Sequence, residues 1–351
     1  HCVTGVQTCA LPIFSRASGA GDQAARDELV GRALFVGAAV GVLVGLFGYL
    51  CAEPLADALE LAPSQRQPFI EYTRAIHLWS PVLALAPLVS NIFLSMGDSR
   101  TPLLLQIGAV VSNFALNPLF IYELGMGENL IVGERWGMAG AAHASGASRG
   151  LAVTAGLTLL AARWGIHWWR VRQVRLAHLT PILRTGIPSA GSIAVYAVVY
   201  ALIVKLVFSE LPPAALGGLS IGFNAFEGVA YPFYLGVAVA TASVVGRNLG
   251  AGDPARARQA IRNARGIATT LGLVFTAVFL GLGSVLVNLF TMDPMVQMQA
   301  LDYVHVLAVS QVFVALEAVE EKVLLGVGKT RPIFWVSVPG NAIRLPLAWL
   351  L

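Results

Sequence analysis

Nine stretches of about 20 or more mostly apolar residues decide what this chain can fold into. A hydrocarbon layer roughly 30 Å thick is crossed by a helix of about 20 such residues. The whole chain is 56% hydrophobic and 12% charged, which is far more apolar than a typical soluble domain. We therefore predict an all-α integral membrane protein, with spans near residues 29–51, 76–96, 102–122, 138–162, 185–208, 214–245, 266–290, 303–325 and 332–351.

A glycine-rich motif occurs twice in the chain, 231 residues apart. The same offset pairs Tyr72 with Tyr303 and Gly97 with Gly328. After a shift of three residues, Asn113-x4-Pro118-Leu119 matches Asn341-x4-Pro346-Leu347. A long internal period of this kind predicts a duplicated fold. The corresponding motif residues are Arg16, Gly19, Gly21 and Asp22 in the first copy and Arg247, Gly250, Gly252 and Asp253 in the second.

The number of spans between the two motifs fixes how the halves are related. Six predicted spans separate Asp22 from Asp253, and because six is even, both motifs lie on the same side of the membrane. The halves are therefore parallel repeats, related by an axis along the membrane normal. Transferring the spans of each half onto the other predicts two pseudo-symmetric helical lobes, with twelve spans in the parent protein and about nine complete here.

The basic residues orient the chain in the membrane. Loops on the motif side hold 16 of the 23 Lys and Arg residues, whereas the opposite loops are mainly acidic. By the positive-inside rule the motif loops are cytoplasmic. The net charge of +4 thus reflects topology, and we expect no nucleic-acid partner.

We expect the chain to divide into four segments. Residues 1–13 resemble a translated sequencing adapter and are expected to be non-native. A truncated N-terminal lobe follows at 14–162, a basic cytoplasmic linker at 163–184 and a truncated C-terminal lobe at 185–351. Trp164, Trp168 and Trp169 in the linker suit anchoring at the membrane interface.

The second motif ends in a helix-start signal. Asp253 followed by Pro254 is typical of an N-cap and a first-turn proline. The arginines that follow, at 256, 258 and 262, predict a short basic amphipathic helix lying at the interface.

Glu227 is the sharpest candidate for a functional side chain. It lies near the middle of a predicted span, where a charge costs roughly 2.5–3.5 kcal/mol on insertion scales. One interpretation is a cation or proton site with Asn224 one turn away. The other is a structural ion pair with Arg149 or Lys205.

Glu317 is the second candidate, slightly to the cytoplasmic side of the middle of its span. Glu320 and Glu321 approach the surface, where Lys322 can snorkel and pair with them. Tyr196 and Tyr231, with Tyr200, suit either a drug site or ordinary packing. His77 and His143 lack a second ligand at metal spacing, so we expect them to be hydrogen-bonded inside the bundle. Arg149 and Arg344 suit structural counter-charges better than ligands.

The sequence contains no recognisable set of catalytic residues. The glycine-rich motif lacks the Gly-Lys-Ser/Thr ending of a phosphate loop and follows a membrane helix. Cys51 is the one cysteine outside residues 1–13, so neither a disulfide framework nor a metal spacing is present. We predict a non-enzyme without a cofactor, driven by an ion gradient.

Four motifs together resemble the multidrug and toxic compound extrusion (MATE) family. They are Arg247-x-x-Gly-Ala-Gly-Asp253, Gly97-Asp-Ser-Arg-Thr-Pro102, Gly137-Met-Ala-Gly-Ala-Ala142 and Gly186-Ile-Pro188. The resemblance implies twelve helices in two lobes that export cationic amphiphilic drugs by alternating access against H+ or Na+. In this resemblance Glu227 matches an acidic position often seen in the family's second-lobe motif. Glu317 lies about one turn from another acidic family position, and Tyr196 stands where some members have a glutamate.

We therefore expect a cation-coupled drug antiporter, monomeric in a bacterial inner membrane, with small cationic drugs and lipid as its partners. A lipid-linked saccharide flippase of the same superfamily is the first alternative, and it needs several basic residues for pyrophosphate. A membrane enzyme or a non-transporting membrane subunit is the second.

Overall fold

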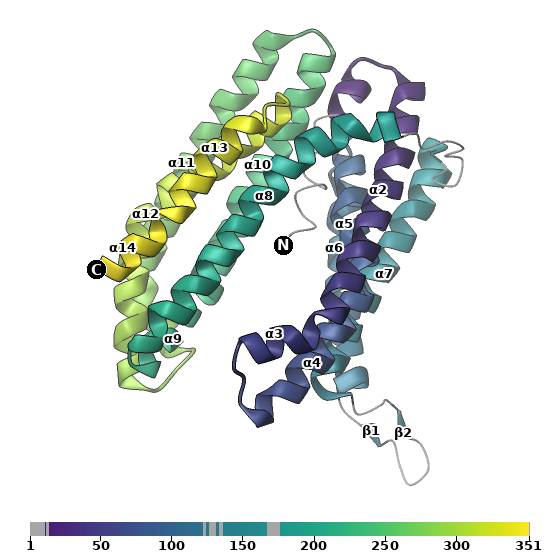
Figure 1. Ribbon diagram of the computed structural model, residues 1–351. Coiled ribbons are helices and arrows are strands. Elements are labelled where there is room, and N and C mark those ends of the chain that lie inside the picture. The colour runs from purple at the N-terminus through teal and green to yellow at the C-terminus, as the bar shows by residue number, and fades with distance from the viewer. Residues whose placement is uncertain are drawn as a thin grey trace. The chain divides into compact units, whose positions relative to one another are not determined.

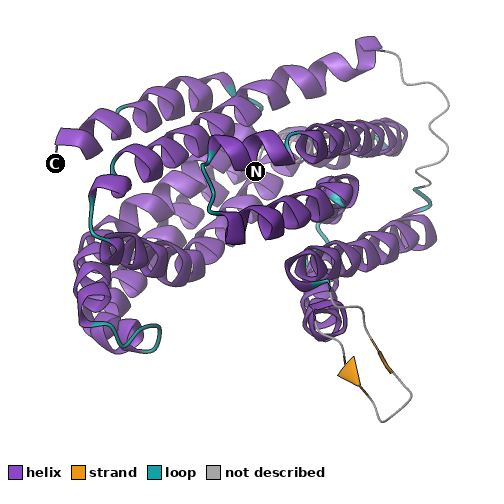
Figure 2. Cartoon of the chain, turned by 60° about the horizontal axis from the view of Figure 1, so that its bottom comes forward, coloured by secondary structure: helices purple, strands orange, loops and turns teal. Residues whose placement is uncertain are grey.

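A computed structural model describes residue 11 and residues 14–121, 124–125, 131–132, 136–166 and 176–350. Trp168 and Trp169 lie outside these residues. The elements follow along the chain in Figure 1, and Figure 2 shows that nearly all of them are helical. They are α2 (Gln23–Leu50), α3 (Ala52–Ala58), α4 (Pro63–Leu78), α5 (Ser80–Ser95), α6 (Arg100–Ile121), β1 (Leu124–Gly125), β2 (Ile131–Val132), α7 (Gly137–Trp164), α8 (Leu176–Leu206), a 3-10 turn (Phe208–Glu210), α9 (Pro213–Ser220), a π-helix (Ile221–Glu227), α10 (Gly228–Gly250), α11 (Pro254–Asn288), α12 (Pro294–Gly326), α13 (Arg331–Ala342) and α14 (Arg344–Leu350).

The helices have the length and composition of membrane spans. Among the described residues, six helices are long and apolar enough to cross a bilayer, or seven if the bent pair α4 and α5 counts as one span. The short pair β1 and β2 is antiparallel and lies in the connection between α6 and α7. The predicted all-α membrane fold is confirmed.

Two of the nine predicted spans form helices that are too short or not apolar enough to meet these criteria of length and hydropathy. The 28-residue α7 is long enough, but its many small residues and Arg149 lower its hydropathy. The span predicted at 332–351 is divided into α13 and α14, which are 12 and 7 residues long.

Two further sequence predictions were wrong in detail. The basic segment after Asp253 is not a separate interfacial helix, because α11 runs unbroken from Pro254 to Asn288. The span predicted at 76–96 is the second part of a longer unit, α4 and α5, which bends by 50° at Trp79. Pro81 explains the break, because proline lacks an N–H and its ring clashes with the carbonyl four residues earlier.

The duplication is visible in the local geometry of each copy. Three helices of the first copy, α2, α4 and α6, begin at residues 23, 63 and 100, and α11, α12 and α13 begin 231 residues later at 254, 294 and 331. Asp22 accepts a hydrogen bond from the Ala25 N–H at 2.9 Å, and Asp253 accepts one from the Arg256 N–H at 3.0 Å. Both side chains therefore cap the helix that follows.

Glycine supplies the turn before each cap. Gly21 and Gly252 have φ values of +72° and +75°, a left-handed conformation that other residues rarely adopt. Gly97 and Gly328, the other glycine pair at the same offset, also have positive φ values of +87° and +74°. The motif glycines thus set the same chain reversal in both copies.

The described part of the chain forms two compact units: the first holds residues 14–18 and the described residues between 22 and 186, and the second holds residues 19–21 and 187–350. In the first unit, helices pack closely around the break at Trp79. A Cβ at Gly146 of α7 would lie 2.0 Å from Cγ of Trp79, and a Cβ at Gly41 of α2 would lie 2.6 Å from Cα of Pro81. Trp79 also donates its indole N–H to Nδ1 of His143 at 3.0 Å. Small residues thus allow close helix contact without a hydrophobic driving force.

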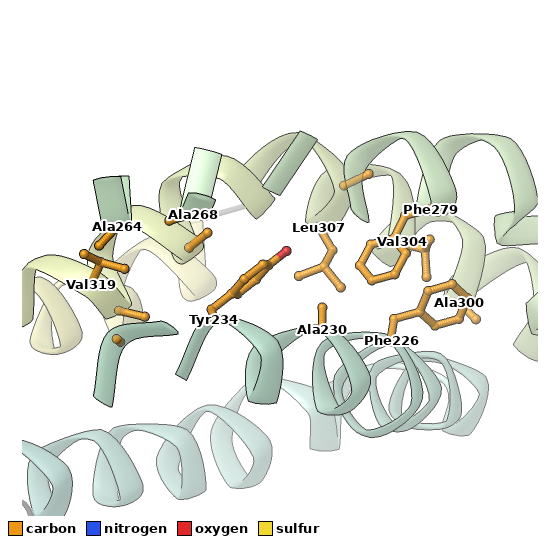
Figure 3. Packing of buried hydrophobic residues seen from close by; sticks show 14 of the residues in the cluster. Phe226, Ala230, Tyr234, Ala264, Ala268, Phe279, Ala300, Val304, Leu307 and Val319 are labelled. Atoms are coloured by element: carbon orange, nitrogen blue, oxygen red, sulfur yellow. The ribbon is translucent and has the colours of Figure 1, made fainter. Parts of the chain in front are cut away.

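In the second unit, α12 packs against α9, α10 and α11. Figure 3 shows the core between these helices, with Tyr234 of α10 among Ala268, Leu307 and neighbouring side chains. The Tyr234 hydroxyl donates to Oε1 of Gln311 at 2.9 Å, and Nε2 of Gln311 donates to the Leu307 carbonyl at 3.0 Å. This buried polar pair is thus satisfied inside an apolar core.

The close contact at Trp79 generates a stability prediction. Gly146→Ala should lower the free energy of unfolding by about 1–3 kcal/mol, because the added methyl group overlaps the indole ring. Gly108→Ala, in the same unit but with no atom within 4 Å of the new Cβ, is the matched control. The control should be neutral or stabilising, since alanine has the higher helix propensity. Thermal unfolding of the two variants measures this, and equal melting temperatures would contradict the packing account.

Asp98 generates a pH prediction. Its carboxylate accepts from the N–H groups of Arg100 and Thr101, each at 3.0 Å, and from the Thr101 hydroxyl at 2.6 Å. Partial burial raises the pKa of Asp98, but these hydrogen bonds and the charge of Arg163 outweigh it and hold the pKa below its ordinary 3.8.

Because the folded pKa is lowered, the stabilisation by Asp98 is present above pH 3.8 and is lost as pH falls through the folded pKa. Wild type should therefore melt above Asp98→Ala at neutral pH, and the difference should shrink below about pH 4. Melting curves between pH 7 and pH 3 measure it. A difference that does not change with pH would show that the Asp98 charge does not stabilise the fold.

Candidate functional site

Glu227 ends a seven-residue π-helix, Ile221–Glu227, between α9 and α10. Wide π turns are rare and often occur at functional sites. The turn packs tightly against α12, because a Cβ at Gly222 would lie 2.0 Å from Cδ1 of Tyr303. Glu227 itself is half-buried. The helix irregularity and the packing of Tyr303 therefore fix where this carboxylate lies.

Asn224 is placed differently from the sequence prediction. Its amide nitrogen donates to the carbonyl and the hydroxyl of Ser220, at 3.0 and 3.3 Å, within its own helix. The side chain is exposed, and both of these hydrogen bonds go to Ser220 and not to Glu227. The π turn changes the angular spacing that the prediction of a shared face assumed.

Glu317 of α12 lies within electrostatic range of Glu227. Tyr231, one turn after Glu227, lies in electrostatic range of Glu321, Glu317 and Glu227, and also near Tyr196. Neither carboxylate forms an ion pair within the described part of the chain. The structure thus brings together four of the five predicted site residues, Glu227, Glu317, Tyr196 and Tyr231.

Arg344, the first residue of α14, is the basic side chain whose charge reaches both carboxylates. The sequence suggested Arg149 or Lys205 as the ionic partner of Glu227, whereas the positive charge that acts on Glu227 in the structure is that of Arg344. Its guanidinium carbon lies 5.5 Å from the centre of the Tyr196 ring. Arg344 lies more than 100 residues after Glu227 in the sequence, so no local sequence pattern could predict that the two side chains are close.

Aromatic side chains continue from Tyr196 along α8 to the π-helix. The rings of Tyr196 and Tyr200 stack with centres 6.3 Å apart, and Tyr200 meets Phe223 at 5.3 Å. Tyr303 also lies in the electrostatic range of Glu227 and Arg344. The sequence analysis did not identify Tyr303 as a site residue. The one signal for it was the four-residue spacing of Gly218 and Gly222, which allows α12 to pack closely at this place.

The outer acidic residues of α12 have structural partners. Glu320 forms a bidentate ion pair with Arg265 of α11: Nε of Arg265 donates to Oε1 at 2.5 Å and Nη2 donates to Oε2 at 3.0 Å. Glu321 pairs with Lys322 at 2.8 Å, which confirms that predicted partnership. The Lys322 side chain is only 10% exposed, so it does not snorkel to the surface. We define the carboxylate–tyrosine cluster as the remaining residues Glu227, Glu317, Arg344, Tyr196, Tyr200, Tyr231 and Tyr303.

The motif residues serve the fold. Asp22 and Asp253 are helix caps, and Gly21 and Gly252 make the turns before them. Gly250 is the last residue of α10. Arg247 lies in the last turn of α10, where a cation interacts favourably with the helix dipole. Arg16 and Gly19 complete the first copy of the pattern.

The histidines of the first unit are hydrogen-bonded, as predicted. Nδ1 of His77 lies 2.7 Å from the Thr73 carbonyl, and His143 accepts from Trp79. Among the described residues, His, Cys, Asp and Glu form no group of three that could hold a metal ion.

Comparison with known proteins places the chain among transporters. The family model MatE matches residues 2–119 and 188–350. The multidrug resistance protein PmpM of Pseudomonas aeruginosa is 26% identical over 343 residues, 94% of this chain and 68% of that protein. The probable multidrug resistance protein NorM of Thermotoga maritima is 25% identical over 356 residues, 96% of this chain and 72% of the relative.

Solved structures share the fold. An outward-facing multidrug resistance MATE family transporter of the MOP superfamily has a TM-score of 0.87 at 18% identity, over 99% of this chain and 76% of that one. A MOP superfamily transporter from Pyrococcus furiosus, described by the reverse polarity of its binding pocket and a suggested different function, has a TM-score of 0.84 at 19% identity, again over 99% and 76%.

Proposed function

Since the chain belongs to the MATE family of multidrug efflux transporters, we propose that it is a cation-coupled antiporter that exports cationic amphiphilic drugs by alternating access. The coupling ion is H+ or Na+, and no organic cofactor takes part. The protein acts as a monomer in a bacterial inner membrane, with the motif loops in the cytoplasm. A bacterial setting agrees with the organisms of its curated relatives.

The observation that carries this proposal is the pair of carboxylates on neighbouring spans, Glu227 and Glu317. Each occupies an apolar span at a cost of roughly 2.5–3.5 kcal/mol on insertion scales. Glu320 and Glu321, in contrast, form structural ion pairs with Arg265 and Lys322 at 4 Å or less. Glu227 and Glu317 form no ion pair of this kind in the described part of the chain, so a transported cation or a proton can bind there.

Competition explains how an ion gradient drives export. A carboxylate attracts a cationic drug only while it is ionised and free of another cation. Binding of H+ or Na+ from outside therefore releases the drug, and release of the ion inside restores the site. Each elementary charge that moves through 100 mV supplies about 2.3 kcal/mol.

The charge of the cluster argues against the flippase alternative. A site for lipid-linked pyrophosphate needs several basic residues, whereas this cluster holds two carboxylates and Arg344 alone as a basic member. The Pyrococcus protein is described by a pocket of reverse polarity on a similar fold. The polarity of the site therefore depends on the residues of each chain, and in this chain the two carboxylates favour cations.

Transport by membrane vesicles tests the proposal. Inside-out vesicles with the transporter expressed from its complete gene should accumulate ethidium under an imposed H+ or Na+ gradient. Glu227→Gln should reduce the gradient-driven rate by more than about tenfold, the factor that corresponds to 1.4 kcal/mol. The gradient that supports accumulation identifies the ion. Wild-type vesicles that move no ethidium under either gradient would refute drug antiport.

The acidic residues of α12 provide an internal comparison. Glu317→Gln should reduce transport by about tenfold or more, whereas Glu320→Gln should change it by less than about twofold. Exposed ion pairs such as Arg265–Glu320 stabilise a protein by only about 0–1 kcal/mol. The two variants are compared at equal protein level. Equal rates would remove Glu317 from the site.

A further inference from the structure

Arg344 lies against the same aromatic surface that would receive a drug cation. Its guanidinium carbon is 5.5 Å from the centre of the Tyr196 ring, within the distance at which a cation is attracted to an aromatic face. Tyr196 begins the aromatic row that continues through Tyr200 to Phe223. The guanidinium thus occupies one end of an extended π surface.

The guanidinium is held in this place by Tyr196 and by one long hydrogen bond. Its hydrogen bond to Oδ1 of Asn341 is 3.5 Å long, at the limit for such a bond. Its charge acts on Glu227 and Glu317, yet Arg344 forms no ion pair with either among the described residues. The residue is exposed. A long side chain with these restraints can move aside when another cation arrives.

The duplicated scaffold does not require an arginine here. The alignment of Asn113-x4-Pro118 with Asn341-x4-Pro346 places Leu116 opposite Arg344. At the 231-residue offset, Ala86 stands opposite Glu317. The second copy therefore carries both an acidic and a basic residue where the first copy is apolar. Their joint presence points to a role beyond packing.

We propose that Arg344 is a tethered cation: it occupies the place of the substrate's positive charge, moves off the Tyr196 ring but stays in range of the two carboxylates when substrate binds, and restricts the site to singly charged aromatic cations. The inference rests on the proposed function and names its substrate class. With Glu227 and Glu317 ionised, and with the charge of Glu321 offset by its ion pair with Lys322, Arg344 leaves the cluster one net negative charge. A planar monocation satisfies that charge and stacks on the tyrosines, whereas a dication leaves an unpaired positive charge.

Two dyes with the same ring system and different charge test this. Ethidium carries one positive charge and propidium carries two. Their affinities are measured by fluorescence titration of the purified transporter in lipid nanodiscs, with wild type, Arg344→Gln, Arg344→Lys and Arg262→Gln. Arg262 is an exposed arginine of α11 outside the cluster, so Arg262→Gln controls for the change in net charge.

Arg344→Gln should bind ethidium about tenfold more tightly and propidium about a hundredfold more tightly. The electrostatic repulsion by Arg344 is proportional to the charge of the dye, so its loss favours a dication twice as much, in free energy, as a monocation. Arg344→Lys and Arg262→Gln should keep the wild-type preference for ethidium. If Arg344→Gln is not folded, Arg344→Met provides a neutral side chain of similar length.

The outcomes separate the two proposals. Wild-type ethidium binding with no shift of preference in Arg344→Gln or Arg344→Met overturns the tethered cation and leaves the proposed function standing. An equal shift in Arg262→Gln also overturns it, because a general change of potential would then be sufficient. A folded wild type that binds neither dye overturns both.

Discussion

The free-energy cost of an unpartnered polar group in hydrocarbon is the constraint on which this structure depends. It forces the backbone into helices, which satisfy their own hydrogen bonds. It also explains why the buried polar side chains form specific pairs, such as Tyr234 with Gln311 and Trp79 with His143. Against this background, carboxylates without an ion pair in the described part of the chain are the costly exceptions, and a transporter can use such a cost to bind a cation.

The two copies of the repeat share their turns but not their chemistry. Positive-φ glycines and aspartate caps recur at the same offset, because the chain reversal at each motif makes the same local demand. The copies differ where helices meet. The first has a break at Trp79, held between glycines of α2 and α7, whereas α12 continues unbroken through Ser310, the equivalent position. The two copies thus share a scaffold, but only the second has Glu317 and Arg344 at positions where the first has apolar residues.

The charge balance of the carboxylate–tyrosine cluster links packing to selectivity. The π turn and the contact of Gly222 with Tyr303 determine the position of Glu227, while the start of α14 brings Arg344 into range of both carboxylates. A site built in this way has few charges, so each one has a large influence on which ligand charge is accepted. The aromatic row adds attraction for planar cations without adding charge.

The sequence by itself determined the membrane setting, the duplication, the helix caps and the identity of the sparse intramembrane charges, because each of these depends on local composition or on a fixed spacing along the chain. The tertiary structure decided which charges meet. Glu227 and Arg344 are far apart in the sequence, and the angular position of Asn224 depends on a π turn stabilised by contact with α12. Helical periodicity assumes regular, straight helices, and it fails at Trp79 and at Ile221–Glu227, where packing between helices outweighs local preference.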